Sequence, residues 1–313
     1  MRAVQSYRTP PRFGNYHAAL GRVAPRSPAP MTTATTTPAV LTCPLCETPT
    51  PDAPVFRTHE QWTLRHCPRC AAIFLANPAT SDELAGDLRW SDTYERERTR
   101  RDTRPLAMRG LRAALRKLQQ SVRRNKLAAL VRAYLPRGGV VLDIGCGRGH
   151  QVSTLPASIV PIGVEIDPEG AAEAQAAFAP RGGRVIRADA LTALTSLDAS
   201  SLDGAILMSY LEHEAQPMPA LRLLRRALRP GAPAFIKVPN HACLNRHIMH
   251  GRWCGYRYPD HVVYYTPRTL RSTLDRAGFD VRRFWFTDRM PTSDNMWIVA
   301  ATRGEAAPTT SAS

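Results

Sequence analysis

The chain has 313 residues, of which 43% are hydrophobic and 22% are charged, a balance typical of globular proteins. This length allows one large domain together with a small accessory module. The sequence predicts no membrane span, because no apolar run approaches the roughly 20 residues that a bilayer requires. It also predicts no secretory signal, because the N-terminal region lacks a continuous apolar core. We therefore expect a cytoplasmic protein.

The formal net charge is +16, and the excess of basic residues is unevenly placed. Residues 1–40 carry five Arg and no acidic residue, and a second excess lies in the segment Arg98–Arg132. Such a segment attracts nucleic acid, an acidic membrane or an anionic substrate. Because no aromatic residue except Tyr134 accompanies these charges, we favour a solvated helix face over a nucleic-acid interface.

Five regions follow one another along the chain. Residues 1–40 are rich in Pro, Thr and Ala, which indicates a disordered leader; their Arg content also fits an organelle transit peptide, and a translation start at Met31 is a third interpretation. A cysteine module occupies 41–77, a linker with a basic helix 78–136, and an α/β domain 137–303. The polar tail 304–313 is predicted to be disordered.

The cysteine module contains the pattern C-x2-C-x20-C-x2-C, formed by Cys43, Cys46, Cys67 and Cys70. Four thiolates in two such knuckles match the tetrahedral coordination of Zn²⁺, and a site with four protein ligands is structural. Metal binding would fold a module that is too small for a core of its own. The alternative, two disulfides, requires an oxidising compartment that nothing in the sequence indicates.

From Val140 onward, apolar runs alternate with helical stretches, which predicts a mostly parallel sheet covered on both faces. The expected strands are 140–144, 159–165, 184–188, 203–209, 233–239, 280–287 and 295–302. The expected helices are 148–156, 168–178, 216–229 and 266–277.

The first of these strands runs directly into a glycine-rich loop, Gly145-Cys-Gly147-Arg-Gly149. Glycines let the backbone turn sharply and approach a ligand at the carboxyl end of the strand. The spacing is GxGxG rather than the GxGxxG of dinucleotide-binding folds. Glu165 ends the next strand, where a carboxylate can accept hydrogen bonds from ribose hydroxyls, and Asp189 follows the third strand.

This set of motifs resembles the class I methyltransferases that use S-adenosylmethionine (SAM), over residues 139–302. The resemblance implies an α/β fold with a seven-stranded Rossmann-like sheet. It implies that Asp143 orients the methionine amino group, that Glu165 holds the ribose, and that Asp189 contacts the adenine amine. The remaining cofactor-binding residues are expected to be Gly145, Gly147, Gly149, Ala190 and Ser209. An NAD-binding Rossmann domain is the less favoured alternative.

Three polar residues, Tyr210, Glu212 and His213, follow the fourth strand, whose end faces the transferring methyl group. We predict a catalytic cluster in which His213, with an ordinary pKa near 6.5, removes a proton from the acceptor. Glu212 would orient the imidazole or bind the substrate. The alternative is that Leu-Glu-His supports the following helix, because many methyltransferases act by proximity alone.

A long insert, 241–265, follows the fifth strand and is rich in aromatic residues and histidines. A loop of this length in a compact domain is usually functional, so we interpret it as a lid or a wall of the acceptor site. Asn240 and His261 are further candidates for substrate contact. His247, His250 and Cys254 do not have a familiar zinc-binding spacing.

The segment from Cys67 to Leu84 resembles the start of a bacterial group that places a zinc module before the methyltransferase domain and includes deoxysugar C-methyltransferases. Those enzymes carry a Tyr-x-Glu-His cluster, matched here by Tyr210, Glu212 and His213. The resemblance implies that His213 is the base and that the other two residues assist. The group carries a further C-terminal domain that does not follow here, which leaves the sugar substrate open.

We therefore expect a methyltransferase that uses SAM and a structural Zn²⁺ and acts on a small molecule, such as a sugar or a secondary-metabolite intermediate. The alternative is a ribosomal RNA methyltransferase, which the zinc knuckles and Arg98–Arg132 suggest. Against it, stacking aromatics and an Asn-Pro-Pro-Tyr-type base pocket are missing. A third hypothesis is a non-catalytic protein whose zinc module docks a partner. The sequence gives no oligomeric state.

Overall fold

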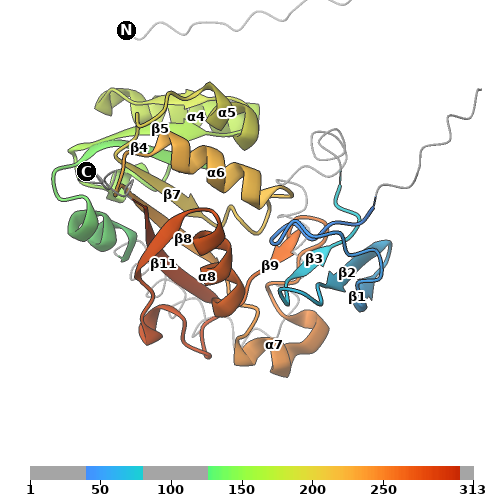
Figure 1. Cartoon of the computed structure of the whole chain (residues 1–313). Helices are drawn as coiled ribbons and strands as arrows, with labels where there is room; N and C mark the ends of the chain where they lie inside the picture. The colour runs from blue at the N-terminus through green and yellow to red at the C-terminus, as the bar shows by residue number, and fades with distance from the viewer. Residues whose placement is uncertain (1–39, 80–125, 304–313) are drawn as a thin grey trace, which may run out of the picture. The chain divides into compact units, whose positions relative to one another are not determined.

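A computed structural model describes residues 40–79 and 126–303 of the chain. The α/β domain is built on a seven-stranded sheet with the order β10-β11-β8-β7-β4-β5-β6 (Figure 1). Its strands are β4 (Gly139–Ile144), β5 (Ile159–Val164), β6 (Arg184–Ile186), β7 (Gly204–Met208), β8 (Pro233–Pro239), β10 (Phe279–Arg283) and β11 (Asn295–Thr302). Strands β4 to β8 pair in parallel, whereas β11 is antiparallel to both of its neighbours. The predicted class I fold is confirmed.

Successive side chains along each strand point to opposite faces of the sheet, and both faces are buried. On β4, Leu142 belongs to one hydrophobic cluster and Val141 to another; on β7, Leu207 and Ile206 divide in the same way. Helices α5 (Ala190–Ser196), α6 (Pro217–Ala227) and α8 (Pro267–Arg276) pack in the first cluster. The helical residues 126–134 pack in the second, so the sheet is covered on both sides. Figure 1 shows α6 and α8 lying across one face of the sheet.

Proline begins each of the long helices α4, α6 and α8, and α4 and α8 also have a side-chain cap. In α4 (Pro168–Phe178), Asp167 accepts a hydrogen bond from the Gly170 amide at 2.7 Å, and Pro168 occupies the first helical position. Helices α6 and α8 also begin at a proline. Proline suits this position because its missing N–H would have no partner there and its φ is already helical. These starts lie within one residue of the predicted ones.

The helix predicted at 148–156 is wrong, because the structure has only a single 3₁₀ turn there, η1 (Val152–Thr154). Gly149, at φ +72°, ends the loop on one side of this stretch. On the other side, Pro156 keeps Leu155 out of the helical region, and Leu155 is extended. Because Leu155 is extended, only residues 150–154 remain between these limits, which is little more than one helical turn.

The strand predicted at 280–287 ends early, at Arg283, and a 3₁₀ turn, η4 (Phe286–Asp288), replaces its second half. The buried carboxylate of Asp288 accepts hydrogen bonds from the Trp285 amide and from Arg283 Nε, both at 3.0 Å. It also forms an ion pair with Lys126 at 2.8 Å. These three contacts hold the chain in a turn where the apolar pattern alone predicts a strand.

Gly149 packs the glycine-rich loop against α4. A Cβ at this position would lie 2.9 Å from the Cα of Ala174 and 3.0 Å from the ring of Phe178. Only glycine fits here, because both the positive φ and the close approach exclude a side chain. The third glycine of the motif therefore fixes the loop to the helix that follows the next strand.

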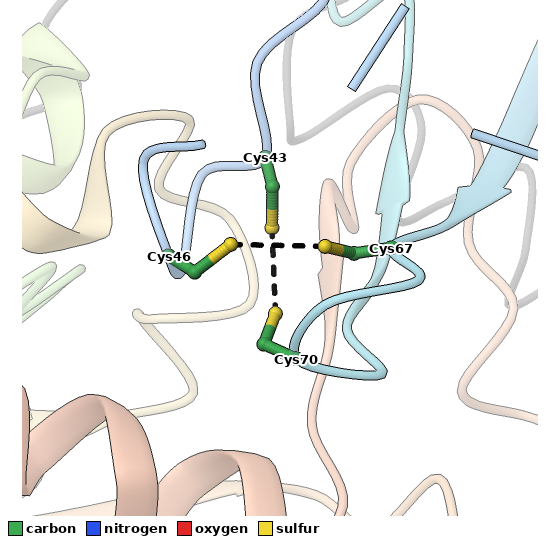
Figure 2. Close-up of side chains that lie close together, drawn as sticks. All are labelled: Cys43, Cys46, Cys67 and Cys70. Atoms are coloured by element: carbon green, nitrogen blue, oxygen red, sulfur yellow. Dashed lines mark hydrogen bonds between the residues drawn. The ribbon is translucent and has the colours of Figure 1, made fainter. Parts of the chain in front are cut away.

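The cysteine module forms a second, antiparallel sheet with the order β1-β2-β3-β9. Strands β1 (Val55–His59), β2 (Trp62–His66) and β3 (Ile73–Leu75) come from the module, and its two cysteine-bearing loops face each other (Figure 2). The fourth strand, β9 (Val263–Tyr264), comes from the insert 241–265, with Ile73 opposite Tyr264. The insert therefore completes the sheet of a module some 190 residues earlier in the chain.

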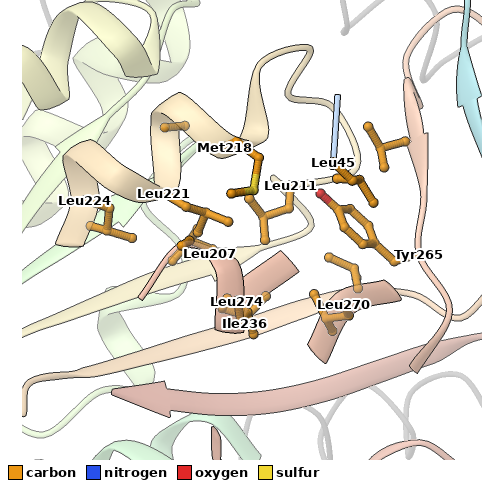
Figure 3. Packing of buried hydrophobic residues seen from close by; sticks show 14 of the residues in the cluster. Leu45, Leu207, Leu211, Met218, Leu221, Leu224, Ile236, Tyr265, Leu270 and Leu274 are labelled. Carbon is orange, nitrogen blue, oxygen red and sulfur yellow. The ribbon is translucent and has the colours of Figure 1, made fainter. Parts of the chain in front are cut away.

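The module also shares a hydrophobic cluster with the α/β domain. Figure 3 shows Leu45 of the module grouped with Leu211, Tyr265 and Leu270, all buried in one cluster. Arg276 at the end of α8 donates to the Cys46 carbonyl at 2.9 Å, and Arg222 of α6 pairs with Glu47. The division at 41–77 and 137–303 thus stays a prediction about folding units, because the two regions have a common core.

Several sequence predictions concern residues outside the described part of the chain. These are the leader 1–40 apart from its last residue, the linker 80–125 with most of the basic segment, and the tail 304–313. Within the residues that the structure describes, no helix has the length and apolar character of a membrane span.

We expect Gly149→Ala to destabilise the protein more than Gly182→Ala does. Both glycines have a φ near +70°, but the space around a Cβ at Gly182 is open. Gly182→Ala should therefore cost only about 1–2 kcal/mol of backbone strain, and Gly149→Ala about 1–3 kcal/mol more from overpacking against Ala174. Urea unfolding of both variants measures the difference, and equal free energies would contradict the packing role of Gly149.

Candidate functional site

A buried carboxylate without a partner lies at the carboxyl end of β4. Asp143 is 2% exposed, and neither of its carboxylate oxygens has a hydrogen-bond partner among the described residues. Burial raises the pKa of Asp143 to about 7, and the nearby charge of Glu165 adds to the rise. A cationic or hydrogen-bond-donating ligand would satisfy this group.

The centre of the glycine-rich loop faces open space beside a second carboxylate. A Cβ on Gly147 would meet no atom within 4 Å, so the backbone here is accessible to a ligand. Glu165 Oε2 accepts a hydrogen bond from the Gly147 amide at 2.8 Å, and its Oε1 accepts one from the Asp167 amide at 2.9 Å. Accessible glycine backbone from the loop and the Glu165 carboxylate from the end of β5 thus lie side by side.

Asp189 caps α5, a role that the sequence did not reveal. Its carboxylate accepts hydrogen bonds from the Thr192 amide at 2.9 Å and the Thr192 hydroxyl at 2.6 Å, and these hold the pKa of Asp189 below its ordinary value. The side chain is exposed and Ala190 is buried beneath it. The predicted adenine contact of Asp189 stays a prediction.

Ser209 follows β7 in a backbone conformation that is rare outside glycine, with φ +58°. Its hydroxyl accepts a hydrogen bond from Lys237 Nζ at 2.8 Å, and its amide donates to the Lys237 carbonyl at 2.8 Å. Non-glycine residues in this region carry strain and concentrate at functional sites. Ser209 thereby links the ends of β7 and β8 next to the glycine-rich loop.

The residues at this edge fit SAM, the cofactor that the resemblance implies. Asp143 offers a buried acceptor for an ammonium group, Gly147 offers uncovered backbone, and Glu165 offers a carboxylate at the end of the second strand of the domain. Strand β4 lies between β5 and β7, which is the point where an open α/β sheet binds ligands.

Tyr210 and Glu212, two of the predicted catalytic residues, lie just beyond β7. The Tyr210 hydroxyl donates a hydrogen bond to Glu214, and burial raises the pKa of Tyr210 well above its ordinary value. The Tyr210 ring also lies 3.7 Å from the position of a Cβ on Gly145, next to the cofactor loop. Glu212 is 2% exposed with Oε2 unpartnered among the described residues, and burial raises its pKa to about 7.

His213 is oriented by the insert. Its Nδ1 lies 2.8 Å from the Asp260 carbonyl oxygen, which can only accept, so Nδ1 carries the proton and Nε2 carries a lone pair. Burial lowers the pKa of His213 to about 4, and the positive charge of Arg257 lowers it further. The imidazole is therefore neutral near pH 7. The sequence analysis predicts that Glu212 orients the His213 imidazole, whereas in the structure the Asp260 carbonyl holds it.

A cavity opens at the carboxyl ends of β7 and β8, beside the loop. It is lined by residues of the helix at 126–134, of the turn after the loop and of the strands or their ends: Leu127, His150, Gln151, Thr154, Met208, Ser209, Lys237 and Trp297. Sequence reasoning gave no role to Lys237 or Trp297. The signal was present for Lys237, because it is the one charged side chain in the apolar strand β8.

Most of the aromatic residues in the insert are buried rather than exposed to a substrate. Trp253, Tyr256, Tyr264 and Tyr265 are each at most 8% exposed. Asn240 is also buried, and its side-chain oxygen accepts a hydrogen bond from the Ala242 amide at 3.1 Å, which starts the insert with a turn. The lid interpretation stays a prediction, but these side chains form the packing between the insert and the two sheets.

The four module cysteines point toward a common centre (Figure 2). The Sγ atoms of Cys43 and Cys70 are 3.6 Å apart, and those of Cys46 and Cys67 are 3.7 Å apart. Four thiolates at about 2.3 Å from a tetrahedral Zn²⁺ lie about 3.8 Å from one another. The cluster therefore fits zinc, and none of the four cysteines forms a disulfide.

Comparison with known proteins identifies the α/β domain. A family model described as a methyltransferase domain matches residues 114–283, more than half of the chain. A search of curated proteins found no match.

Solved structures that are similar to this chain include two methyltransferases. A SAM-dependent methyltransferase from Archaeoglobus fulgidus is 25% identical, with 57% of this chain and 94% of that chain covered and a TM-score of 0.45. A 1,6-didemethyltoxoflavin-N1-methyltransferase from Burkholderia thailandensis is 20% identical, with 80% and 100% covered and a TM-score of 0.49.

We expect the four cysteines to hold one zinc ion per chain, and Cys67→Ser to contain one zinc ion fewer than the wild type. Removing one of four thiolates opens a closed structural site, and the metal that folds the module is then lost. Elemental analysis measures the zinc content, and limited proteolysis measures the order of residues 40–79. Cys254→Ser, at an exposed cysteine outside the cluster, is the matched control and should retain the metal. An equal zinc content per chain in Cys67→Ser and Cys254→Ser would contradict the assignment.

Proposed function

Because the chain belongs to the methyltransferase-domain family, we propose that it transfers a methyl group from SAM to a small-molecule acceptor, such as a sugar or a secondary-metabolite intermediate. The observation that carries this proposal is the unpartnered, buried carboxylate of Asp143 at the edge of the glycine-rich loop. A carboxylate in this position is costly to the folded protein unless a ligand compensates it. The ammonium group of SAM is such a ligand.

Each part of the cofactor has a matching group along this edge. Asp143 would bind the methionine ammonium, the backbone of Gly145 and Gly147 would line the cofactor, and Glu165 would accept hydrogen bonds from the ribose hydroxyls. Further along, Asp189 and Ala190 would contact the adenine. When bound, SAM supplies an electrophilic methyl group. The chain's own residues then have to hold the acceptor in line with it and remove its proton.

The acceptor would lie at the carboxyl ends of β7 and β8, with its body in the cavity that Lys237 and Trp297 line and its reacting group toward His213, which follows β7. An ammonium group and an indole ring together suit a small acceptor with a planar or apolar body and a polar or anionic oxygen. Ser209 holds Lys237 at 2.8 Å, so the direction of the cation is fixed before the acceptor binds. A cavity of this kind supports a small molecule rather than a flat nucleic-acid surface as the acceptor.

His213 would act as the general base through Nε2. Its Nδ1–H is held by the Asp260 carbonyl, and its low pKa keeps Nε2 unprotonated near neutral pH. A neutral imidazole in a fixed tautomer is ready to accept the acceptor's proton, whereas an imidazolium is not. Tyr210 and Glu212 would assist, Tyr210 from its place beside the loop and Glu212 through its buried carboxyl group.

The domain assignment remains part of this proposal. Residues 41–77 would form a zinc-stabilised module and residues 137–303 the catalytic domain, joined by 78–136. The leader 1–40 and the tail 304–313 would lie outside both. The protein would act in the cytoplasm.

The acceptor can be sought by metabolite profiling of a strain that lacks the protein. We expect a species lighter by one methyl group to accumulate and to be converted to the heavier product when purified protein and SAM are added. If no accumulated small molecule is methylated while SAM binds normally, the small-molecule acceptor would be contradicted and the cofactor site retained.

With that acceptor in hand, we expect His213→Ala to lower turnover about 10²–10⁴-fold, the usual contribution of a general base. The affinity for SAM should stay unchanged, because His213 lies on the acceptor side. The matched control is His247→Ala, which removes an exposed histidine of the insert. Turnover near that of the control would show that His213 is not the base.

A further inference from the structure

A second cluster of metal-ligating side chains exists apart from the four cysteines. Glu212 and His213 follow β7, and His261 lies in the insert just before β9. Each of the three offers one ligand atom, and these atoms all lie within 4.8 Å of one another. Among the described residues, this cluster and the cysteine cluster are the two groups that could hold a metal ion.

Both histidines are held in the tautomer that a metal requires. His213 Nδ1 donates to the Asp260 carbonyl at 2.8 Å, and His261 Nδ1 donates to the Gly255 carbonyl at 2.8 Å. The two rings meet edge to face, with centroids 4.7 Å apart. Metal-binding histidines usually donate their second N–H to a carbonyl or carboxylate in this way, which fixes the ring and leaves Nε2 for the metal.

Glu212 supplies the negative charge of the cluster. It is 2% exposed, and its Oε2 has no hydrogen-bond partner among the described residues. A buried carboxylate oxygen without a donor is costly, and a cation at this point would satisfy it. The backbone carbonyl of Glu212 accepts from the Val262 amide at 2.8 Å, so the residue is fixed to the same insert that carries His261.

We propose that Glu212, His213 and His261 bind one divalent transition-metal ion, at a site separate from the Cys43–Cys70 cluster. Two imidazoles and one carboxylate suit Zn²⁺, Fe²⁺, Co²⁺ or Ni²⁺ better than Mg²⁺ or Ca²⁺. Three protein ligands leave coordination positions open, so an oxygen of a small molecule can bind the same ion.

The dimensions allow this site with a small adjustment. Ligands at about 2.0–2.2 Å from a metal lie about 3.0–3.5 Å from one another. The upper limit of 4.8 Å between the present ligand atoms therefore requires the side chains to close by about 1.8 Å or less. The neighbouring cation Arg257 forms an ion pair with the buried Asp260 at 2.9 Å, so its charge is balanced beside the site.

Metal binding and proton removal compete for the same atom. The Nε2 lone pair of His213 either accepts a proton from the acceptor or binds a metal, and it cannot do both. A metal ion at the cluster would thus inhibit a reaction in which His213 is the base.

Cobalt(II) titration of full-length protein that carries one equivalent of zinc per chain, which the four thiolates bind first, tests the proposal. We expect one Co²⁺ to bind per chain, with visible d–d absorption and without the thiolate charge-transfer bands that cobalt at the cysteines would give. His261→Ala and the isosteric variant Glu212→Gln should each lower the Co²⁺ affinity at least tenfold. His247→Ala should bind Co²⁺ like the wild type. Circular dichroism and zinc content verify that each variant is folded.

Two results would overturn the site. One is the absence of Co²⁺ binding beyond the zinc already present, and the other is wild-type Co²⁺ affinity in both His261→Ala and Glu212→Gln. If one of these two variants fails to fold, the Co²⁺ affinity of the other still tests the site. The titration contains neither SAM nor an acceptor, so its outcome is independent of whether the protein transfers methyl groups.

Discussion

The uncompensated carboxylate of Asp143 sets what the sheet edge can bind. A charge buried at the end of a central strand costs free energy, and the protein lowers this cost by raising the pKa of Asp143 to about 7 rather than by supplying a partner. The glycine-rich loop beside Asp143 leaves room for a ligand. The loop turns away at Gly145, Gly147 has open space, and Glu165 fixes the loop backbone from the next strand.

A chain of contacts connects the cysteine cluster to the acceptor side. The module's strand β3 pairs with β9 of the insert, and the residues just before β9 hold the end of β7. The amides of Val262 and Val263 donate to the Glu212 carbonyl, and the Asp260 carbonyl accepts from His213. The cysteine module is therefore connected, through the backbone pairing of β3 with β9, to the insert residues that hold Glu212 and His213.

The sequence predicted those features that depend on local pattern. The strand β4, the glycine spacing and the acidic end of β5 lie within about 25 residues, and local sterics determine them. The starts of α4, α6 and α8 were also predictable, because a proline at the first helical position is a local signal. The cysteine cluster could be predicted because its spacing specifies a tetrahedral ion.

The features that the sequence did not predict depend on long-range contacts. The turn at Phe286–Asp288 needs Lys126, which lies some 160 residues earlier. The pairing of β3 with β9 and the orientation of His213 by Asp260 need the insert in its folded place. The absence of a helix at 148–156 has a local cause. Gly149 and Pro156 limit the helix from both sides, and these two residues outweigh the apolar pattern between them.

The pH dependence of SAM binding tests the central assignment most directly. If SAM binds the ionised carboxylate of Asp143 as proposed, its affinity should rise with pH through the pKa of about 7 and fall up to tenfold per unit below it. Above about pH 8 the gain should end as the ammonium of SAM loses its proton. Calorimetry should show this rise for the wild type, and weaker binding without the rise for Asp143→Asn. Absence of SAM binding, or an equal affinity of the two proteins across this range, would contradict the account.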